Sequence, residues 1–346
     1  MNRRIYFWIF LSSILISVGC SESSTRINSS FKSLHNPDES DYYIEDALSG
    51  HFHVPNAVRE YDWEEHPKGK IKVTTNNLGF KNDKNTIIEK QTNTTRILIT
   101  GDSHTDGVLY NNESVASHLE NLLNDSSKNK KYECLNAGVG YFSFQNYLGT
   151  LKKFLYLKPD VFIVIVYTGN DFIESIRIEA MNERLNVPER PADYYDDLWK
   201  IDEIAPGFTG QVINQLKFFK TFPAFKDTAI AIAIQNFEEI QRLCKQNNIE
   251  LLAVLLPTKA DVESETDSER LTMVREQIGL SYEDSEINKT LAHILEKSLQ
   301  SRTIKTINLQ LIWEQDTINE FFWKADYHVN HRGHEAMAVK IFEKIN

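Results

Sequence analysis

The sequence contains little cysteine and no paired cysteine motif. Only 3 of the 346 residues are cysteines, and no Cys-x-x-Cys pair is present, which argues against a domain held together by disulfides. Cys134 lies in an apolar run and Cys244 in a helical pattern. We therefore expect both to be buried free thiols, with a single bridge between them as the alternative that spacing leaves open.

Several other signatures are missing. There is no internal repeat, no coiled-coil heptad pattern and no GxGxxG phosphate-binding loop. Basic residues are outnumbered by acidic ones, which gives a formal net charge of -11. An acidic surface repels phosphate backbones. We expect no nucleic-acid partner. With 41% hydrophobic and 25% charged residues, the chain has the composition of a globular protein with one large domain.

The first twenty residues predict export. Arg3 and Arg4 precede an apolar run from Ile5 to Val18, which is shorter than the roughly 20 residues of a membrane-spanning helix. The run ends at Gly19-Cys20, and a small residue before cysteine resembles a bacterial lipoprotein signal. We expect residues 1–19 to be a signal peptide and Cys20 to carry a lipid that anchors the chain to a membrane of the cell envelope, facing the periplasm or in the outer membrane of a Gram-negative cell. Plain secretion is the alternative.

The rest of the chain divides by composition. Residues 20–50 are polar and predict a flexible tether, and 51–94 predict an extension packed on the main domain. From residue 95 to 346, short apolar runs alternate with segments of helical period, which is typical of an α/β fold with a mostly parallel sheet. The expected strands are 96–100, 132–136, 161–167, 250–256 and 305–309, and the expected helices are 114–124, 144–157, 224–246, 286–299 and 331–344.

An insertion at about 172–222 interrupts this alternation and is rich in aromatic residues. One interpretation is a lid or substrate platform in which Tyr194, Tyr195 and Trp199 bind substrate; the other is a structural cap on the sheet.

Polar clusters follow three of the expected strands. Gly101–Gly107 contains Ser103, whose hydroxyl would project into a cleft, and His104, which we expect to form a wall of the pocket. Asn136–Tyr141 is rich in glycine, and Gly169–Asp171 offers the Asn170 amide. Because ligands gather at the carboxyl ends of parallel strands, these loops are expected to surround one crevice.

A fourth cluster precedes the last helix. If Asp326–His328 is extended, residues two apart face the same side, so the Asp326 carboxylate can orient the His328 imidazole. His328, His331 and His334 recur every third residue, but three-residue steps drift around a helix axis, so we expect no metal site.

Together the four clusters, in this order, resemble the SGNH/GDSL hydrolases from about residue 74 to the C-terminus. The resemblance implies a flavodoxin-like three-layer α/β/α sandwich with a five-stranded sheet and no cofactor. It also implies that Ser103 is the nucleophile, His328 the base and Asp326 the orienting acid, and that Ser103, Gly140 and Asn170 form the oxyanion hole.

Two departures from the family pattern leave alternatives open. The glycine block is one residue short, so the donor is Gly140, which alignment from Gln145 favours, or Gly138. Asp326 lies two residues before His328 where the hydrolases usually have three, a spacing similar to that of polysaccharide O-acetyltransferases.

The sequence thus predicts an esterase for short acyl or acetyl esters, with an ester or acylated carbohydrate of the cell envelope or extracellular space as substrate. The alternatives are an O-acetyltransferase and a non-catalytic carbohydrate-binding protein on the same fold.

Overall fold

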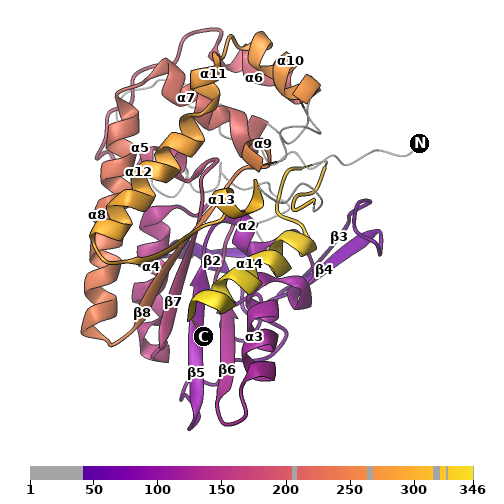
Figure 1. Cartoon of the computed structure of the whole chain (residues 1–346), viewed down its shortest axis with the longest axis vertical. Coiled ribbons are helices and arrows are strands. Elements are labelled where there is room, and N and C mark those ends of the chain that lie inside the picture. The colour runs from indigo at the N-terminus through magenta and orange to yellow at the C-terminus, as the bar shows by residue number, and fades with distance from the viewer. Residues whose placement is uncertain (1–41, 205–208, 263–267, 315–319, 325, 346) are drawn as a thin grey trace.

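The computed structural model describes residues 42–204, 209–262, 268–314, 320–324 and 326–345. At its centre lies a five-stranded sheet with the order β6-β5-β7-β8-β9, in which every neighbouring pair is parallel (Figure 1). The strands are β5 (Thr94–Thr100), β6 (Lys131–Asn136), β7 (Val161–Tyr167), β8 (Glu250–Leu256) and β9 (Lys305–Asn308). All five expected strands are confirmed, with small shifts at their ends.

Continuous apolar runs in the strands build a core on each face of the sheet. In β7, Phe162, Val164 and Val166 belong to one buried cluster. Ile163 and Ile165 belong to the other, because successive side chains of a strand point to opposite faces.

Helices cover both faces, so the predicted three-layer α/β/α sandwich is confirmed (Figure 1). Residues of α4 (Phe144–Phe154), α8 (Phe225–Gln246) and α12 (Ile287–Ser301) lie in the first core. Residues of α3 (Val115–Ser126) and α14 (His331–Ile345) lie in the second. Among the described residues, no helix combines the length and the apolar character that crossing a bilayer requires.

Short elements connect these layers. Those of the insertion are α5 (Asp171–Met181), α6 (Tyr194–Ile204), η4 (Thr209–Ile213) and α7 (Asn214–Thr221). The others are α2 (Ser103–Asp106), η2 (Asn111–Glu113), η3 (Leu155–Leu157), α9 (Lys259–Val262), α10 (Ser268–Gln277), α11 (Tyr282–Ser285) and α13 (Gln310–Trp313).

The N-terminal extension begins earlier than expected. It contains two antiparallel hairpins, β1 (Tyr43–Asp46) with β2 (Gly50–His53) and β3 (Val58–Asp62) with β4 (Lys70–Thr74). The tether predicted for 20–50 is therefore too long at its C-terminal end, because Tyr42 and Tyr43 pack against His53. The predicted signal peptide at 1–19 and the predicted lipidation site Cys20 lie outside the described residues.

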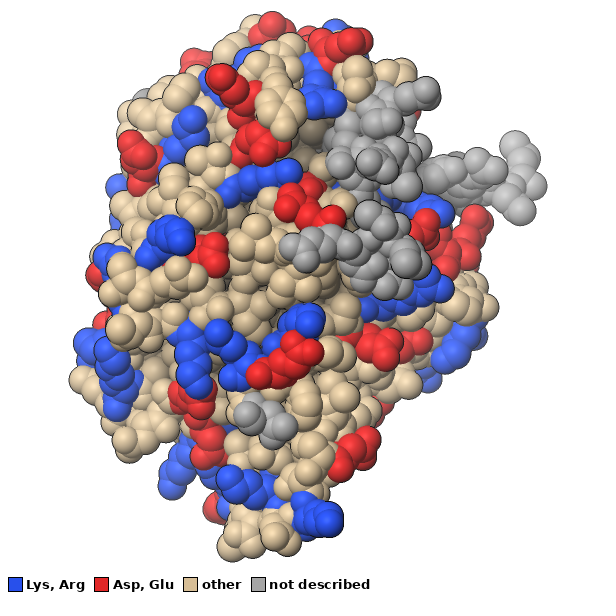
Figure 2. All heavy atoms as spheres, viewed as in Figure 1, with Lys and Arg blue, Asp and Glu red and all other residues tan. Residues whose placement is uncertain are grey.

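Charge is mixed on the face shown in Figure 2, where lysine and arginine are interspersed with aspartate and glutamate. Cys134 and Cys244 are buried free thiols, as the sequence favoured.

Candidate active site

The loops that follow β5, β6 and β7 lie at the carboxyl edge of the sheet, and the loop after β5 is hydrogen-bonded both to the loop after β6 and to the segment before α14. The loops that follow these strands carry Ser103, Gly140 and Asn170, and the segment before α14 carries His328. All parallel strands present their carboxyl ends to one edge, which is where open α/β sheets form their binding crevices.

Ser103, His328 and Asp326 form a connected chain of hydrogen bonds. The Nε2 atom of His328 lies 2.8 Å from Oγ of Ser103, although 225 residues separate them in the sequence. On the other side of the ring, Nδ1 lies 2.8 Å from Oδ2 of Asp326. The carboxylate only accepts, so Nδ1 carries the proton and Nε2 presents its lone pair to the serine hydroxyl.

The Asp326 carboxylate raises the pKa of His328, as is required of a general base. Burial by itself lowers the pKa of His328, but the Asp326 carboxylate beside it reverses this effect, so the pKa lies above its usual value of 6.5. A raised pKa makes the imidazole a stronger proton acceptor.

Asp326 reaches His328 by a tight turn and not by the extended conformation that we expected. Tyr327 between them has φ 64°, in the left-handed region, and Oδ1 of Asp326 accepts the backbone N–H of His328 at 3.0 Å. This is an Asx turn, in which the carboxylate folds back over the chain. The contact between the Asp326 carboxylate and the His328 ring is present, although the extended backbone on which that expectation was conditional is not.

Close packing around α2 explains why residue 101, two positions before Ser103, is glycine. A Cβ atom at Gly101 would lie 2.0 Å from Oγ1 of Thr105 and 2.8 Å from the carbonyl oxygen of Ile165. Asp102 caps α2 by accepting the His104 N–H at 2.9 Å. Burial raises the pKa of Asp102 to about 7, although the bond from the His104 N–H opposes the shift.

The two candidate glycines differ in their hydrogen bonds. The N–H of Gly138 donates to Oδ1 of Asn136 at 3.0 Å, and a Cβ there would meet the Asp106 nitrogen at 2.5 Å. Position 138 therefore has no room for a side chain, and its N–H is already used within the protein. The N–H groups of Gly140 and Ser103 donate to no acceptor within the described ranges. Of the two glycines, Gly140 is the one whose N–H is available to a ligand.

Asn170 follows β7 and is half-buried. Its Oδ1 atom has no hydrogen-bond partner in the described part of the chain. The neighbouring Asp171 anchors the loop, because its Oδ2 atom accepts from the Tyr147 hydroxyl at 2.7 Å and from the Tyr167 N–H at 2.9 Å.

His104 does not form a wall of the pocket. It is fully buried and stacks on Tyr167, with ring centroids 3.6 Å apart. Nδ1 accepts the Val329 N–H at 3.2 Å, and Nε2 donates to Oε1 of Gln211 at 2.9 Å. Both ring nitrogens are used within the protein, so His104 joins the serine loop to the histidine segment.

The aromatic residues of the insertion are placed differently from the predicted platform. Tyr194 is only 1% exposed and belongs to the apolar core, so its ring offers no surface to a sugar. Tyr195 packs against the same cluster, and Trp199 is half-buried on the same helix. The insertion reaches the site instead through Gln211, so the structural-cap interpretation fits Tyr194 better.

The extension also reaches the site, through residues that the sequence did not single out. His51 Nε2 donates to the carbonyl oxygen of Gly140 at 2.8 Å. At the last residue of α2, the Asp106 carboxylate lies 3.2 Å from Lys81 Nζ and 3.5 Å from His53 Nε2. Burial alone would raise the pKa of Asp106, but these two neighbours lower it to about 2. No sequence motif marked these residues.

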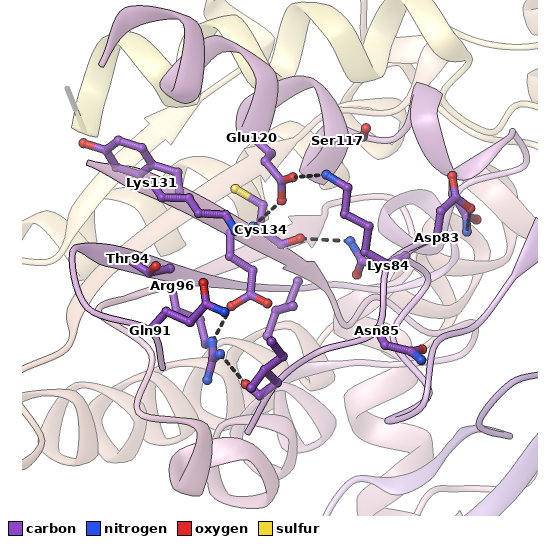
Figure 3. Close-up of a pocket in the computed structure, with 16 residues that line it drawn as sticks. Asp83, Lys84, Asn85, Gln91, Thr94, Arg96, Ser117, Glu120, Lys131 and Cys134 are labelled. Atoms are coloured by element: carbon purple, nitrogen blue, oxygen red, sulfur yellow. Dashed lines mark hydrogen bonds and ion pairs between the residues drawn. The ribbon is translucent and has the colours of Figure 1, made fainter. Parts of the chain in front are cut away.

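A cavity of about 190 Å³ lies elsewhere, along the outer edge of β6 (Figure 3). Its lining includes Arg96, Glu120 and Glu133 but none of the four clusters' candidate residues. Two ion pairs lie in its lining: Arg96 Nε is 2.6 Å from the Glu133 carboxylate, and Lys84 Nζ is 3.3 Å from that of Glu120.

In the ranges that the structure covers, no three His, Cys, Asp or Glu side chains are arranged to hold a metal ion. His334, one of the three spaced histidines, accepts the Val115 N–H at Nδ1.

No protein-family model and no curated protein sequence matches this chain. Among solved structures it is similar to an acetyl xylan esterase (14% identity, 72% of this chain and 100% of that chain, TM-score 0.41). It is also similar to a putative lipolytic protein of the G-D-S-L family from Desulfitobacterium hafniense (13%, 72% and 99%, TM-score 0.40). A third is an acetylxylan esterase from Geobacillus stearothermophilus (13%, 73% and 94%, TM-score 0.41).

Proposed function

We propose that this chain is a serine esterase in which Ser103 is the nucleophile, His328 the general base and Asp326 the group that orients it. The observation that carries the proposal is the hydrogen-bonded series from the Asp326 carboxylate through the His328 ring to the Ser103 hydroxyl, with both steps at 2.8 Å. A nucleophile within hydrogen-bond reach of a base that a third group orients is the arrangement required for acyl transfer.

The reaction proceeds in two halves. His328 Nε2 takes the Ser103 proton while Oγ attacks the ester carbonyl carbon, and the same nitrogen then gives that proton to the departing alcohol oxygen. Water next loses a proton to His328, attacks the acyl-serine and releases the carboxylic acid as the proton returns to Oγ. The N–H groups of Ser103 and Gly140 and the Asn170 amide stabilise the oxyanion in both halves.

We propose short acyl groups, acetyl first among them, on cell-envelope or extracellular polysaccharide. The envelope location is proposed from residues 1–20, with Cys20 as the lipidated residue. Palmitate labelling that persists in a Cys20→Ser variant would contradict the anchor.

Activity of the detergent-solubilised full chain tests the esterase proposal. We expect hydrolysis of p-nitrophenyl acetate that a Ser103→Ala variant loses, and a sharp decline in rate as the acyl chain of the ester lengthens. Equal rates in the two proteins would exclude Ser103 as the nucleophile.

Acetyl transfer to a sugar is the second candidate, favoured by the spacing of Asp326 and His328. The same acyl-serine would then react with a sugar hydroxyl. Adding an acceptor oligosaccharide and measuring acetylated sugar against free acetate distinguishes the two functions.

A further inference from the structure

The first hairpin of the extension lies against the glycine loop of the candidate site. His51 in β2 is 5% exposed, and its Nε2 atom lies 2.8 Å from the Gly140 carbonyl oxygen, 89 residues further along the chain. A carbonyl oxygen only accepts, so the ring carries a proton on Nε2.

We propose that His51 is a positioning residue that holds Gly140 so that its N–H faces the reacting carbonyl. This inference rests on the esterase function proposed above. His51 itself does not touch the substrate; it acts through the backbone of Gly140.

The glycine loop needs such support at Gly140 more than elsewhere. Earlier in the loop, the Ala137 N–H donates to Ile99 and the Val139 N–H to Gly101, which fasten the chain to β5 and its end. Within the described residues, the bond from His51 is the one hydrogen bond made by Gly140. Glycine has the widest backbone freedom, and the turn over Gly140 and Tyr141 is closed by a long backbone bond, from the Phe142 N–H to the Val139 carbonyl oxygen at 3.3 Å.

His51 is well held itself. Its strand pairs with β1, where Glu45 is its partner, and its backbone carbonyl accepts from Oγ of Ser49 at 3.0 Å. The ring contacts Phe142 edge-on, with centroids 5.1 Å apart. A rigid donor on a paired strand can therefore fix the loop to within the fraction of an ångström that an oxyanion donor requires.

The test compares His51→Phe and His51→Gln. Phenylalanine fills the space without a donor, and the glutamine amide can donate to the same carbonyl. We expect kcat for p-nitrophenyl acetate to fall about 10- to 100-fold in His51→Phe with KM within about twofold, because part of one oxyanion donor is lost. His51→Gln should regain most of that loss.

Thr75→Val is the matched control. Thr75 is buried in the same extension and donates to the Val54 carbonyl, away from the glycine loop. This variant should lose stability but keep kcat. His51→Leu is a second variant without a donor, should His51→Phe fail to fold.

The outcomes are separable. If the wild type shows no Ser103-dependent turnover, the esterase proposal fails. If Ser103-dependent turnover is present but His51→Phe or His51→Leu keeps it in full, or His51→Gln is no better than they are, the positioning role of His51 is wrong. If Thr75→Val loses as much kcat as His51→Phe, the loss reflects general damage to the extension, and the positioning role of His51 is likewise wrong.

Discussion

His104 accepts the backbone N–H of Val329 at Nδ1, so the residue after Ser103 holds the residue after His328. The ring also stacks on Tyr167 and donates to Gln211, which fixes its orientation. The serine and histidine of the candidate pair are thus joined by a second link, one residue away from the first.

Replacing His104 by leucine should therefore affect stability and rate together. The Val329 N–H and the Gln211 amide oxygen would be left buried without partners, at about 1–3 kcal/mol each. We expect a lower free energy of unfolding in urea and a reduced kcat. A His104→Leu variant as stable and as active as the wild type would show that this link is unimportant.

The pH dependence of the rate follows from the raised pKa of His328. The base must be neutral to accept a proton, so kcat/KM should fall as the pH drops through a value above 6.5. The Asp326 charge is the largest influence that raises this pKa, so Asp326→Asn should move the acidic limb to lower pH and reduce kcat by up to about 10⁴-fold. Profiles recorded from pH 5 to 8.5 check both statements; an acidic limb that does not move in Asp326→Asn contradicts them.

The Asn170 amide should act mainly in the transition state. Loss of one oxyanion donor typically lowers kcat by about 10²–10³-fold. We expect this loss in Asn170→Ala with little change in KM. A raised KM at constant kcat would assign Asn170 to substrate binding instead.

Side chains of α3 cover the outer edge of the sheet along β6. Asn124 of α3 bonds both the N–H and the carbonyl of Tyr132, at 2.9 and 3.0 Å, as a neighbouring strand would. One turn earlier, Glu120 accepts the Cys134 N–H (Figure 3). An edge strand without such cover is a template for pairing with another chain. Asn124→Ala should lower stability by about 1–3 kcal/mol and promote concentration-dependent association, measurable by sedimentation velocity. Asn124→Asp, which keeps the acceptor, should be affected less.

The sheet and the order of the site clusters could be predicted from the sequence because apolar runs such as Val161–Tyr167 allow few other interpretations. The first hairpin could not, since the residues of β1 show no apolar alternation and its partner supplies the pairing. Likewise, nothing in the identity of Tyr327 indicates a left-handed backbone, and tertiary contacts alone decide whether His104 or Tyr194 faces a cleft or the core.

His328 is proposed to activate Ser103. The most direct test of this proposal is the rate at which a fluorophosphonate probe labels the protein, with the modified residue located by peptide mass spectrometry. We expect one probe per chain, on Ser103, and labelling at least about 100-fold slower in His328→Ala, because the base is gone. Labelling at the same rate in both proteins, or an active protein whose Ser103 remains unlabelled, would contradict the account.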